Sequence, residues 1–279
     1  MLEKVRSAIT ATLGSRADSA EAHYALGVNS AVLGRLEEAE VALRLARDAR
    51  PDYWWAYFAL GVVFADQGKH ADAARELTRA LQGLPAMPRV HRALSRAFQG
   101  QGDTERAVET LKAALETCRK SAEIGMVHEE LGGAYYALGR YREAIGQFEA
   151  ALEMRPRDPY LRVNLGASYL AEGDTERASE ELCGALEAQP DLMSALRNLG
   201  TLYMKTRDFD KARRLLERAA ALDPGHANTL RKLAVTCYEL GDETQAEAHM
   251  RRAIELEGQG AMGTAGQGRR VAAGGPDGR

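Results

Sequence analysis

The chain has 279 residues, of which 28% are charged and 45% hydrophobic, and its net charge is −3 at pH 7. A nearly neutral chain has no basic field that would attract nucleic acid or an anionic membrane. Its three cysteines, Cys118, Cys183 and Cys237, are far apart and form no CxxC pair, which predicts reduced thiols rather than a disulfide framework.

The first residues predict a short amphipathic helix. From Leu2 to Leu13, Val5 and Ile9 lie on one side, and charged residues interrupt what would otherwise be the apolar stretch of a signal peptide. No apolar run in the chain approaches the length of a membrane span. We therefore expect residues 1–19 to form a partial repeat that caps the first full unit, and we expect a cytoplasmic protein.

The rest of the chain repeats one unit of about 34 residues. In the clearest copy, small and bulky residues recur at i, i+3, i+4 and i+7, which is one face of a helix. A glycine then breaks the pattern, and a second amphipathic helix follows until a proline, which lacks an amide donor, ends it. These positions are His128, Leu131, Gly132, Tyr135, Gly139, Ala144, Phe148, Ala151 and Pro156.

The same order of small and large residues predicts seven units. Each unit is a helical hairpin that cannot bury its apolar faces alone, so the units must stack on their neighbours. We number the slots of a unit from its first residue, so that slots four, seven, eight and eleven form the core face of its first helix. The units are residues 20–53, 54–87, 88–121, 125–158, 159–192, 193–226 and 227–257.

Three residues depart from the repeated pattern. Ser95 and Ala234 replace the glycine of slot eight, and Arg207 replaces the glycine of the turn between the two helices. Because the other slots of these units keep the pattern, we expect the fold to tolerate all three.

The end of the chain has a different composition. Residues 258–279 are rich in glycine and nearly free of bulky apolar side chains, which predicts a disordered tail. The run from Gly258 to Gly263 matches GxGxxG, but no strand precedes it, so its context excludes a dinucleotide site. On the last helix, Met250 and Ile254 leave some apolar surface, which allows weak self-association through the last repeat.

No arrangement of catalytic or metal-binding residues stands out. His23, His91 and His128 each take slot four, on the core face, which favours packing over metal binding. The carboxylates are scattered, and no nucleophile has a base at a characteristic spacing. We therefore predict a protein without enzymatic activity, cofactor or metal.

The order Leu-Gly, aromatic, Ala, Leu or Phe, Ala and Pro closely resembles the tetratricopeptide repeat family. The resemblance covers the chain from Ala20 to about Glu257. It implies an all-α fold, a right-handed α-solenoid superhelix of about seven helix-turn-helix repeats. It also implies that the first helices line a concave groove that holds extended peptides or partner helices.

Two zones of this expected groove are apolar and basic. Trp55 and Phe58 are i, i+3 neighbours in the apolar zone, and the alternative is that these rings pack between units. Arg89, Arg92 and Arg96 share one helical face in the basic zone. Like charges at this spacing repel, so an acidic ligand is the sharper interpretation and a solvated basic face is the alternative.

A third zone is polar. Asn164 and Asn198 take slot six of consecutive units, where an amide can donate to and accept from a peptide backbone. The pair is similar to the asparagine ladder of O-linked N-acetylglucosamine transferase repeats and of kinesin light chain, while the carboxylate clamp for chaperone tails does not fit this sequence. The other residues of the zone are Tyr160, Arg197, Thr201, Asn228, Arg231 and Lys232.

Together these zones predict a non-enzymatic scaffold for protein–protein interaction. Its ligand would be an extended, acidic segment with apolar anchors, or a partner helix, held in the groove. One alternative is the substrate-recognising arm of a glycosyltransferase-like or other enzyme complex, and another is a self-assembling structural repeat protein. We expect neither nucleic acid nor a membrane as a partner.

Overall fold

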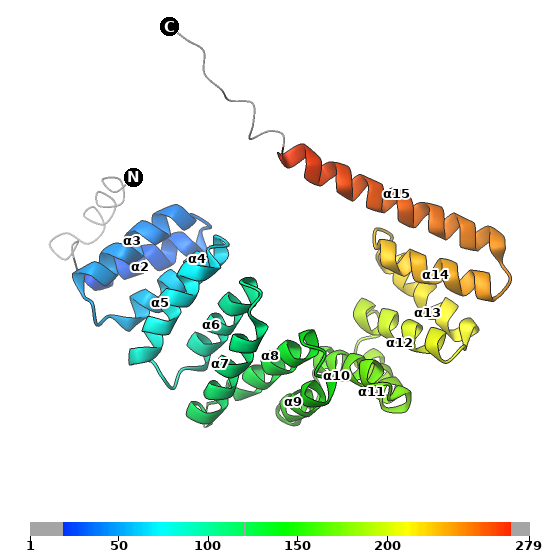
Figure 1. The fold of residues 1–279 in the computed structure, drawn as a ribbon, viewed down its shortest axis with the longest axis horizontal. Helices are drawn as coiled ribbons and strands as arrows, with labels where there is room; N and C mark the ends of the chain where they lie inside the picture. The colour runs from blue at the N-terminus through cyan, green and yellow to red at the C-terminus, as the bar shows by residue number, and fades with distance from the viewer. Residues whose placement is uncertain (1–18, 120, 269–279) are drawn as a thin grey trace, which may run out of the picture. The chain divides into compact units, whose positions relative to one another are not determined.

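The computed structural model describes residues 19–119 and 121–268, and the side chains of residues 19–119 and 121–258. These residues form fourteen α-helices and no strand, joined by short turns (Figure 1). The all-α solenoid of about seven repeats is therefore confirmed. Within the same residues, no helix is both long and apolar enough to cross a membrane. The capping helix expected near residues 2–13 lies outside the described residues.

The chain divides after Arg155 into two compact units. In the N-terminal unit, eight helices form four successive hairpins, and each helix contacts the next one along the chain. They are α2 (Ala20–Val32), α3 (Leu36–Ala49), α4 (Trp54–Asp66), α5 (His70–Gly83), α6 (Pro88–Gly100), α7 (Thr104–Thr117), α8 (Ile124–Ala137) and α9 (Tyr141–Met154).

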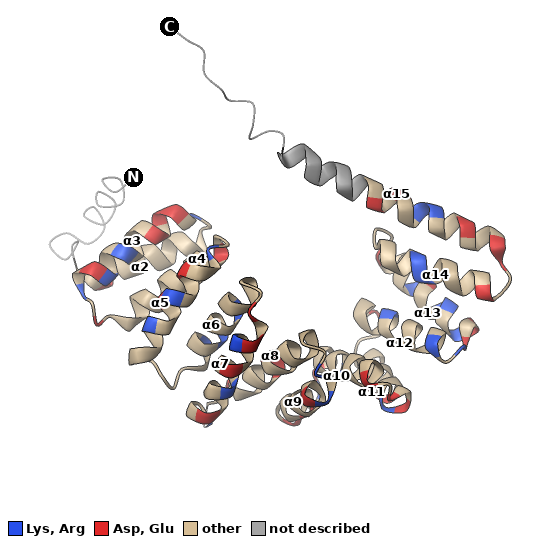
Figure 2. Cartoon of the chain, viewed as in Figure 1, with Lys and Arg blue, Asp and Glu red and all other residues tan. Residues whose placement is uncertain are grey.

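The C-terminal unit contains three hairpins built in the same way. Its helices are α10 (Pro159–Glu172), α11 (Thr175–Ala188), α12 (Met193–Lys205), α13 (Phe209–Leu222), α14 (Ala227–Glu239) and α15 (Glu243–Gly268). Figure 2 shows basic and acidic residues interspersed along the helices of both units, as is usual for solvated helix faces.

Two helix boundaries differ from the expected ones. Helix α8 begins at Ile124, one residue before the expected start of its unit at Gly125. Helix α15 continues to Gly268, although we expected the helical part to end before Gly258. No proline interrupts this stretch, so the helix can propagate along the backbone from its packed first half despite the glycines.

The glycine of slot eight lets the two helices of a hairpin approach each other closely. A Cβ atom built on Gly61 would lie 2.5 Å from Cγ of Leu77, and one built on Gly166 would lie 2.8 Å from Cγ of Leu182. Both leucines are fully buried. At the same slot of the third repeat, Ser95 is also fully buried, and its hydroxyl has no hydrogen-bond partner among the residues that the structure describes.

Each turn between the two helices of a hairpin needs one residue with a left-handed backbone conformation, that is, with positive φ. Gly139, with φ of 72°, and Gly173, with φ of 98°, supply it at little steric cost. Arg207 takes the same conformation, with φ of 61°, where its Cβ makes it less favourable. The sixth repeat therefore keeps the turn and accepts some backbone strain.

Candidate functional site

First helices of consecutive repeats contact one another within each unit. Their residues at slots two, five, six, nine and twelve therefore form continuous surfaces. We call the surface of α2, α4, α6 and α8 the N-terminal face, and the surface of α10, α12 and α14 the C-terminal face. The expected groove residues divide between these two faces.

On the N-terminal face, the aromatic residues of α4 divide between core and surface. Trp54 lies against Gly83, and Tyr57 is buried. The ring of Trp55 is 38% exposed and meets the half-buried ring of Phe58 edge to face, with centroids 6.2 Å apart. Phe58 also packs against the core, so Trp55 is the main aromatic contact that α4 offers to solvent.

The three arginines of α6 are paired with carboxylates of α8 and of Glu123, the residue that precedes it. Arg92 Nε and Nη2 both donate to Oε1 of Glu130, at 3.0 and 2.9 Å, and Arg96 donates to the same oxygen. Arg89 Nη2 lies 2.6 Å from Oε1 of Glu123. The repulsion expected between these arginines is therefore offset inside the unit, because Glu130 stands at slot six of the next repeat.

The carboxylate of Glu130 is satisfied on one side only. Its Oε1 receives the arginine donors, whereas its Oε2 is buried without a hydrogen-bond partner among the described residues. An ionised oxygen in this position costs desolvation free energy that the ion pairs must offset.

The C-terminal face presents free amides at the same slot. Asn164 and Asn198 are half-buried, and their side-chain amides make no hydrogen bond to any residue that the structure describes. The backbone oxygen of Asn164 accepts from the Ser168 hydroxyl at 2.8 Å, and this bond does not involve the side-chain amide. Both amides are available to a ligand backbone.

Beside these amides lies a lysine without a counter-ion. Lys232 Nζ donates to Oγ1 of Thr201 at 2.6 Å, and Lys232 makes no ion pair within the described residues. The hydroxyl of Thr201 in turn donates to the backbone oxygen of Arg197 at 2.7 Å. Burial lowers the pKa of Lys232 from its usual value of 10.5, and the neighbouring charge of Arg197 lowers it further.

The other expected residues of this zone lie around that lysine. Arg197 has a distant counter-ion, since its Nη1 is 3.7 Å from Oδ2 of Asp223. Arg231 is paired with Glu257 of α15. Tyr160 and Asn228 are exposed at the start of their helices. Among the described residues of this zone, Lys232 thus has no counter-ion and Arg197 has only a distant one.

Sequence reasoning missed two apolar residues of the C-terminal face. Val235 is 42% exposed and Tyr238 is 65% exposed, one and two turns beyond Lys232 on α14. They take slots nine and twelve of the last repeat, so the repeat register alone could have indicated them. They place apolar surface next to the lysine.

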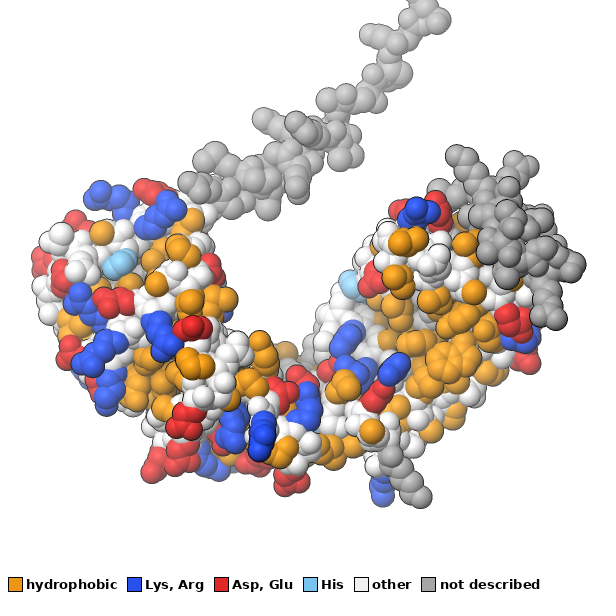
Figure 3. All heavy atoms as spheres, turned by 180° about the vertical axis from the view of Figure 1, so that it is seen from behind, with side chains coloured by type: hydrophobic (Ala, Val, Ile, Leu, Met, Phe, Trp, Pro, Cys, Tyr) orange, Lys and Arg blue, Asp and Glu red, His pale blue; other side chains and the backbone are white. Residues whose placement is uncertain are grey.

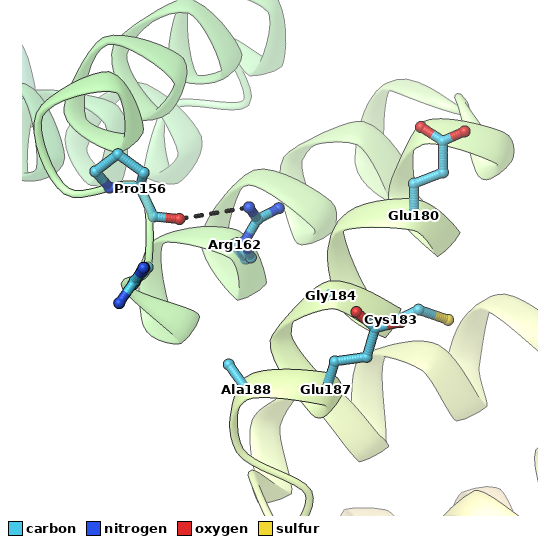
Figure 4. A pocket seen from close by; sticks show the side chains of 8 residues that line it. Pro156, Arg162, Glu180, Cys183, Gly184, Glu187 and Ala188 are labelled. Carbon is cyan, nitrogen blue, oxygen red and sulfur yellow. Dashed lines mark hydrogen bonds between the residues drawn. The ribbon is translucent and has the colours of Figure 1, made fainter.

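A hollow of about 720 Å³ also lies in the C-terminal unit, away from this face (Figure 4). Arg162 is held there by the Pro156 backbone oxygen and by Glu181, and glutamates line the opposite wall. Charges of both signs line this hollow and give no preference for a ligand of either sign, so we assign no site to it.

The slot-four histidines take packing and hydrogen-bonding positions. His91 is buried and its Nε2 lies 2.8 Å from the backbone oxygen of Pro85, while His128 Nδ1 lies 2.8 Å from Oε1 of Gln147. His23 is also buried. Among the described residues, no group of three or more His, Cys, Asp or Glu side chains is arranged to hold a metal ion.

Comparison with protein families decides the identity of the repeats. Models described as tetratricopeptide repeat match residues 3–53, 64–131, 135–202 and 191–256. The chain belongs to the tetratricopeptide repeat family. Proteins with this fold are generally non-catalytic, and this tetratricopeptide repeat protein is a protein–protein interaction scaffold.

Solved structures show the same fold at low sequence identity. A tetratricopeptide repeat protein from Parabacteroides merdae is 16% identical, with a TM-score of 0.68 over 91% of this chain and 93% of that one. PilF of Pseudomonas aeruginosa is 22% identical, with a TM-score of 0.61 over 80% and 94%. YrrB, described as a TPR protein with an unusual peptide-binding site, is 22% identical, with a TM-score of 0.56 over 68% and 97%. No curated protein matches the sequence.

Proposed function

We propose that this scaffold binds an extended acidic peptide segment on its C-terminal face. The observation that carries the proposal is Lys232, a half-buried ammonium group without a carboxylate partner among the described residues. Desolvating an unpaired charge costs free energy, and a ligand carboxylate would recover it. The same reasoning applies more weakly to Arg197, whose counter-ion is 3.7 Å away.

The neighbouring residues support an extended backbone for this ligand. A peptide in extended conformation exposes unpaired N–H and C=O groups, and the free amides of Asn164 and Asn198 can both donate to and accept from them. Consecutive repeats offer these amides at the same slot, so one peptide can meet both. Val235 and Tyr238 then offer an apolar contact beside the carboxylate site.

The proposed ligand is therefore an extended segment in which an acidic side chain is followed closely by an apolar one. Electrostatic attraction favours the acidic residue and contact with Tyr238 favours the apolar one. A separate candidate surface lies in the N-terminal unit, where the exposed slots are apolar and basic and not polar. It consists of Trp55, Phe58, Arg89, Arg92 and Arg96.

Peptide selection tests this proposal. Random peptides selected on the wild-type protein should be enriched in segments that combine Asp or Glu with an apolar residue. Lys232→Met should weaken their binding at least tenfold, about 1.4 kcal/mol, measured by fluorescence anisotropy. The double variant Asn164→Ala, Asn198→Ala should weaken it through lost backbone hydrogen bonds.

Lys211→Met is the matched control. Lys211 lies in the same unit on α13, the second helix of its hairpin, and it pairs with Asp208. This variant loses the same charge and should keep the affinity. If selected peptides lack acidic residues, or if both lysine variants bind equally well, the acidic-peptide function is wrong.

A further inference from the structure

Helix α4 has no polar face. Its thirteen residues, WWAYFALGVVFAD, contain one charged residue, Asp66, at the very end. A helix that is apolar all round is usually buried all round. In this chain, Trp55 is exposed, and Phe58 and Val62 are only half-buried.

The uncovered residues of α4 form a narrow stripe along the helix. Trp55, Phe58, Val62 and Ala65 follow one another at intervals of three or four residues, and all four remain partly accessible. This interval is that of the seam by which one helix packs along another. An extended peptide, by contrast, presents side chains to one surface at every second residue.

The neighbouring helix α2 continues this apolar surface. Tyr24, Val28 and Ala31 are half-buried on α2, and they recur at the same helical interval. Helices α2 and α4 contact each other, so the two stripes run on adjacent helices of the N-terminal unit. Figure 3 shows hydrophobic side chains gathered over the first repeats, which contain these helices.

The other side of α4 is bordered by arginines. Helix α6 contacts α4, and Arg89 and Arg96 on α6 keep 66% and 63% of their side chains exposed although each is paired. Arg92, Arg96 and Glu130 together carry one positive charge in excess. A ligand on α4 would thus meet apolar side chains in the middle and a basic border at one edge.

We propose that α2 and α4 bind an amphipathic helix of a partner protein, whose apolar stripe packs on the stripe of α4. Acidic residues on one edge of that helix face Arg89 and Arg96. This second surface does not depend on the acidic-peptide site of the C-terminal unit, since the two lie in different units. Trp55 is its central contact, because aromatic residues dominate the binding energy of such interfaces.

The test uses a displayed library of random peptides about twenty residues long, the length at which a bound helix can span several turns. It is selected on the full-length Lys232→Met protein, so that the proposed acidic-peptide site does not contribute. Enriched peptides should carry apolar residues at intervals of three and four with acidic residues on one flank. Their circular dichroism should become helical on binding, and tryptophan emission should shift to the blue.

Two substitutions should weaken these peptides at least tenfold. Trp55→Ala removes the central ring, and Val62→Lys places a charge in the middle of the stripe. Leu222→Ala is the matched control, since it removes an exposed apolar side chain from the other unit and should leave the affinity unchanged. Circular dichroism of each free variant checks that the repeats remain folded.

Several results would overturn the proposal. They are the enrichment of no peptide at all, enriched peptides that bind without gaining helix, or affinities that survive both substitutions. Concentration-dependent dimerisation that Trp55→Ala abolishes would also overturn it, because a second copy of this chain would then cover the stripe.

Discussion

The N-terminal and C-terminal faces are built from the same kind of repeat but differ in how their charges are balanced. On the N-terminal face, Glu130 at slot six pairs with both Arg92 and Arg96 of α6, the first helix of the preceding repeat. On the C-terminal face, the same slot holds Asn164, Asn198 and Lys232, and the lysine has no acidic partner among the described residues. The exposed slots of the two faces therefore differ in their charge balance, while the buried slots keep the same packing.

The largest expected effect tests whether the two units are independently stable. Ala144 of α9 and Ala178 of α11 take the same slot, and both are fully buried. Ala144→Leu should overpack the N-terminal unit and cost about 1–3 kcal/mol of unfolding free energy. Ala178→Leu should do the same to the C-terminal unit.

Denaturant unfolding, followed by a separate probe in each unit, measures how each substitution shifts the two transitions. Tryptophan fluorescence reports the N-terminal unit, which holds Trp54 and Trp55, and a dye on Cys183 reports the C-terminal unit. Each substitution should shift the transition of its own unit more than that of the other, because repeats interact mainly with their nearest neighbours. Equal shifts of both probes would show one cooperative block, and unchanged transitions would contradict the repeat register.

The next effect concerns the charge balance of the N-terminal face. Glu130→Gln removes the carboxylate but keeps the shape, which leaves Arg92, only 17% exposed, without a counter-ion. The N-terminal face would then resemble the C-terminal face. We expect the affinity for acidic peptides to rise about tenfold in a Lys232→Met background, which corresponds to about 1.4 kcal/mol.

Glu123→Gln provides the comparison for this gain. It frees Arg89, which is largely exposed and whose charge solvent already screens, so its effect on acidic-peptide affinity should be small. Equal affinities for the two glutamine variants would show that Glu130 does not neutralise a potential binding site.

A smaller effect distinguishes two buried serines. The Ser95 hydroxyl in α6 has no hydrogen-bond partner in the described part of the chain, whereas Ser168 in α10 donates to the backbone oxygen of Asn164 at 2.8 Å. Ser95→Ala should stabilise the protein by about 1 kcal/mol, because it removes an unsatisfied hydroxyl from the core. Ser168→Ala should be neutral or destabilising, and stabilisation of the same size in both variants, measured by chemical denaturation, would contradict this explanation.

The sequence predicted the fold well because packing constrains the buried slots. Only glycine fits at Gly61 and Gly166 without moving a leucine, so the repeat register is visible in the residue types themselves. It predicted the site less completely. The three arginines looked unpaired in the sequence because their partners lie 34 or more residues away: Glu123 pairs with Arg89, and Glu130 pairs with Arg92 and Arg96.

The lack of a partner for Lys232 was equally invisible in the sequence. Whether a lysine is solvated, paired or half-buried depends on which helices surround it, and helical periodicity only assigns a side chain to a face. The repeat register does place Val235 and Tyr238 at exposed slots, so the sequence could have indicated this apolar pair. Helical periodicity thus predicted which slots face the surface, and it did not predict how the charges at those slots are paired.

The smallest expected effect follows from the pKa of two lysines in the C-terminal unit. Burial lowers the pKa of Lys232, whereas the hydrogen bond to Asp208 raises the pKa of Lys211 above the same usual value of 10.5. The protonated form of Lys232 therefore costs stability below its folded-state pKa, and this cost disappears as the pH rises toward 10.5. Lys211 instead contributes stability below 10.5 and loses that contribution as the pH rises through its higher folded-state pKa.

Melting temperatures at about pH 7 and about pH 10 test these opposite signs. Lys232→Met should be more stable than the wild type at neutral pH, and the difference should narrow at the higher pH. Lys211→Met should be no more stable than the wild type at neutral pH, because its ion pair is exposed and weak. A saturating acidic peptide should reverse the order for Lys232, since a bound carboxylate favours the protonated lysine. If Lys232→Met gains no stability without the peptide, the lysine is solvated, and the desolvation argument for a ligand carboxylate is wrong.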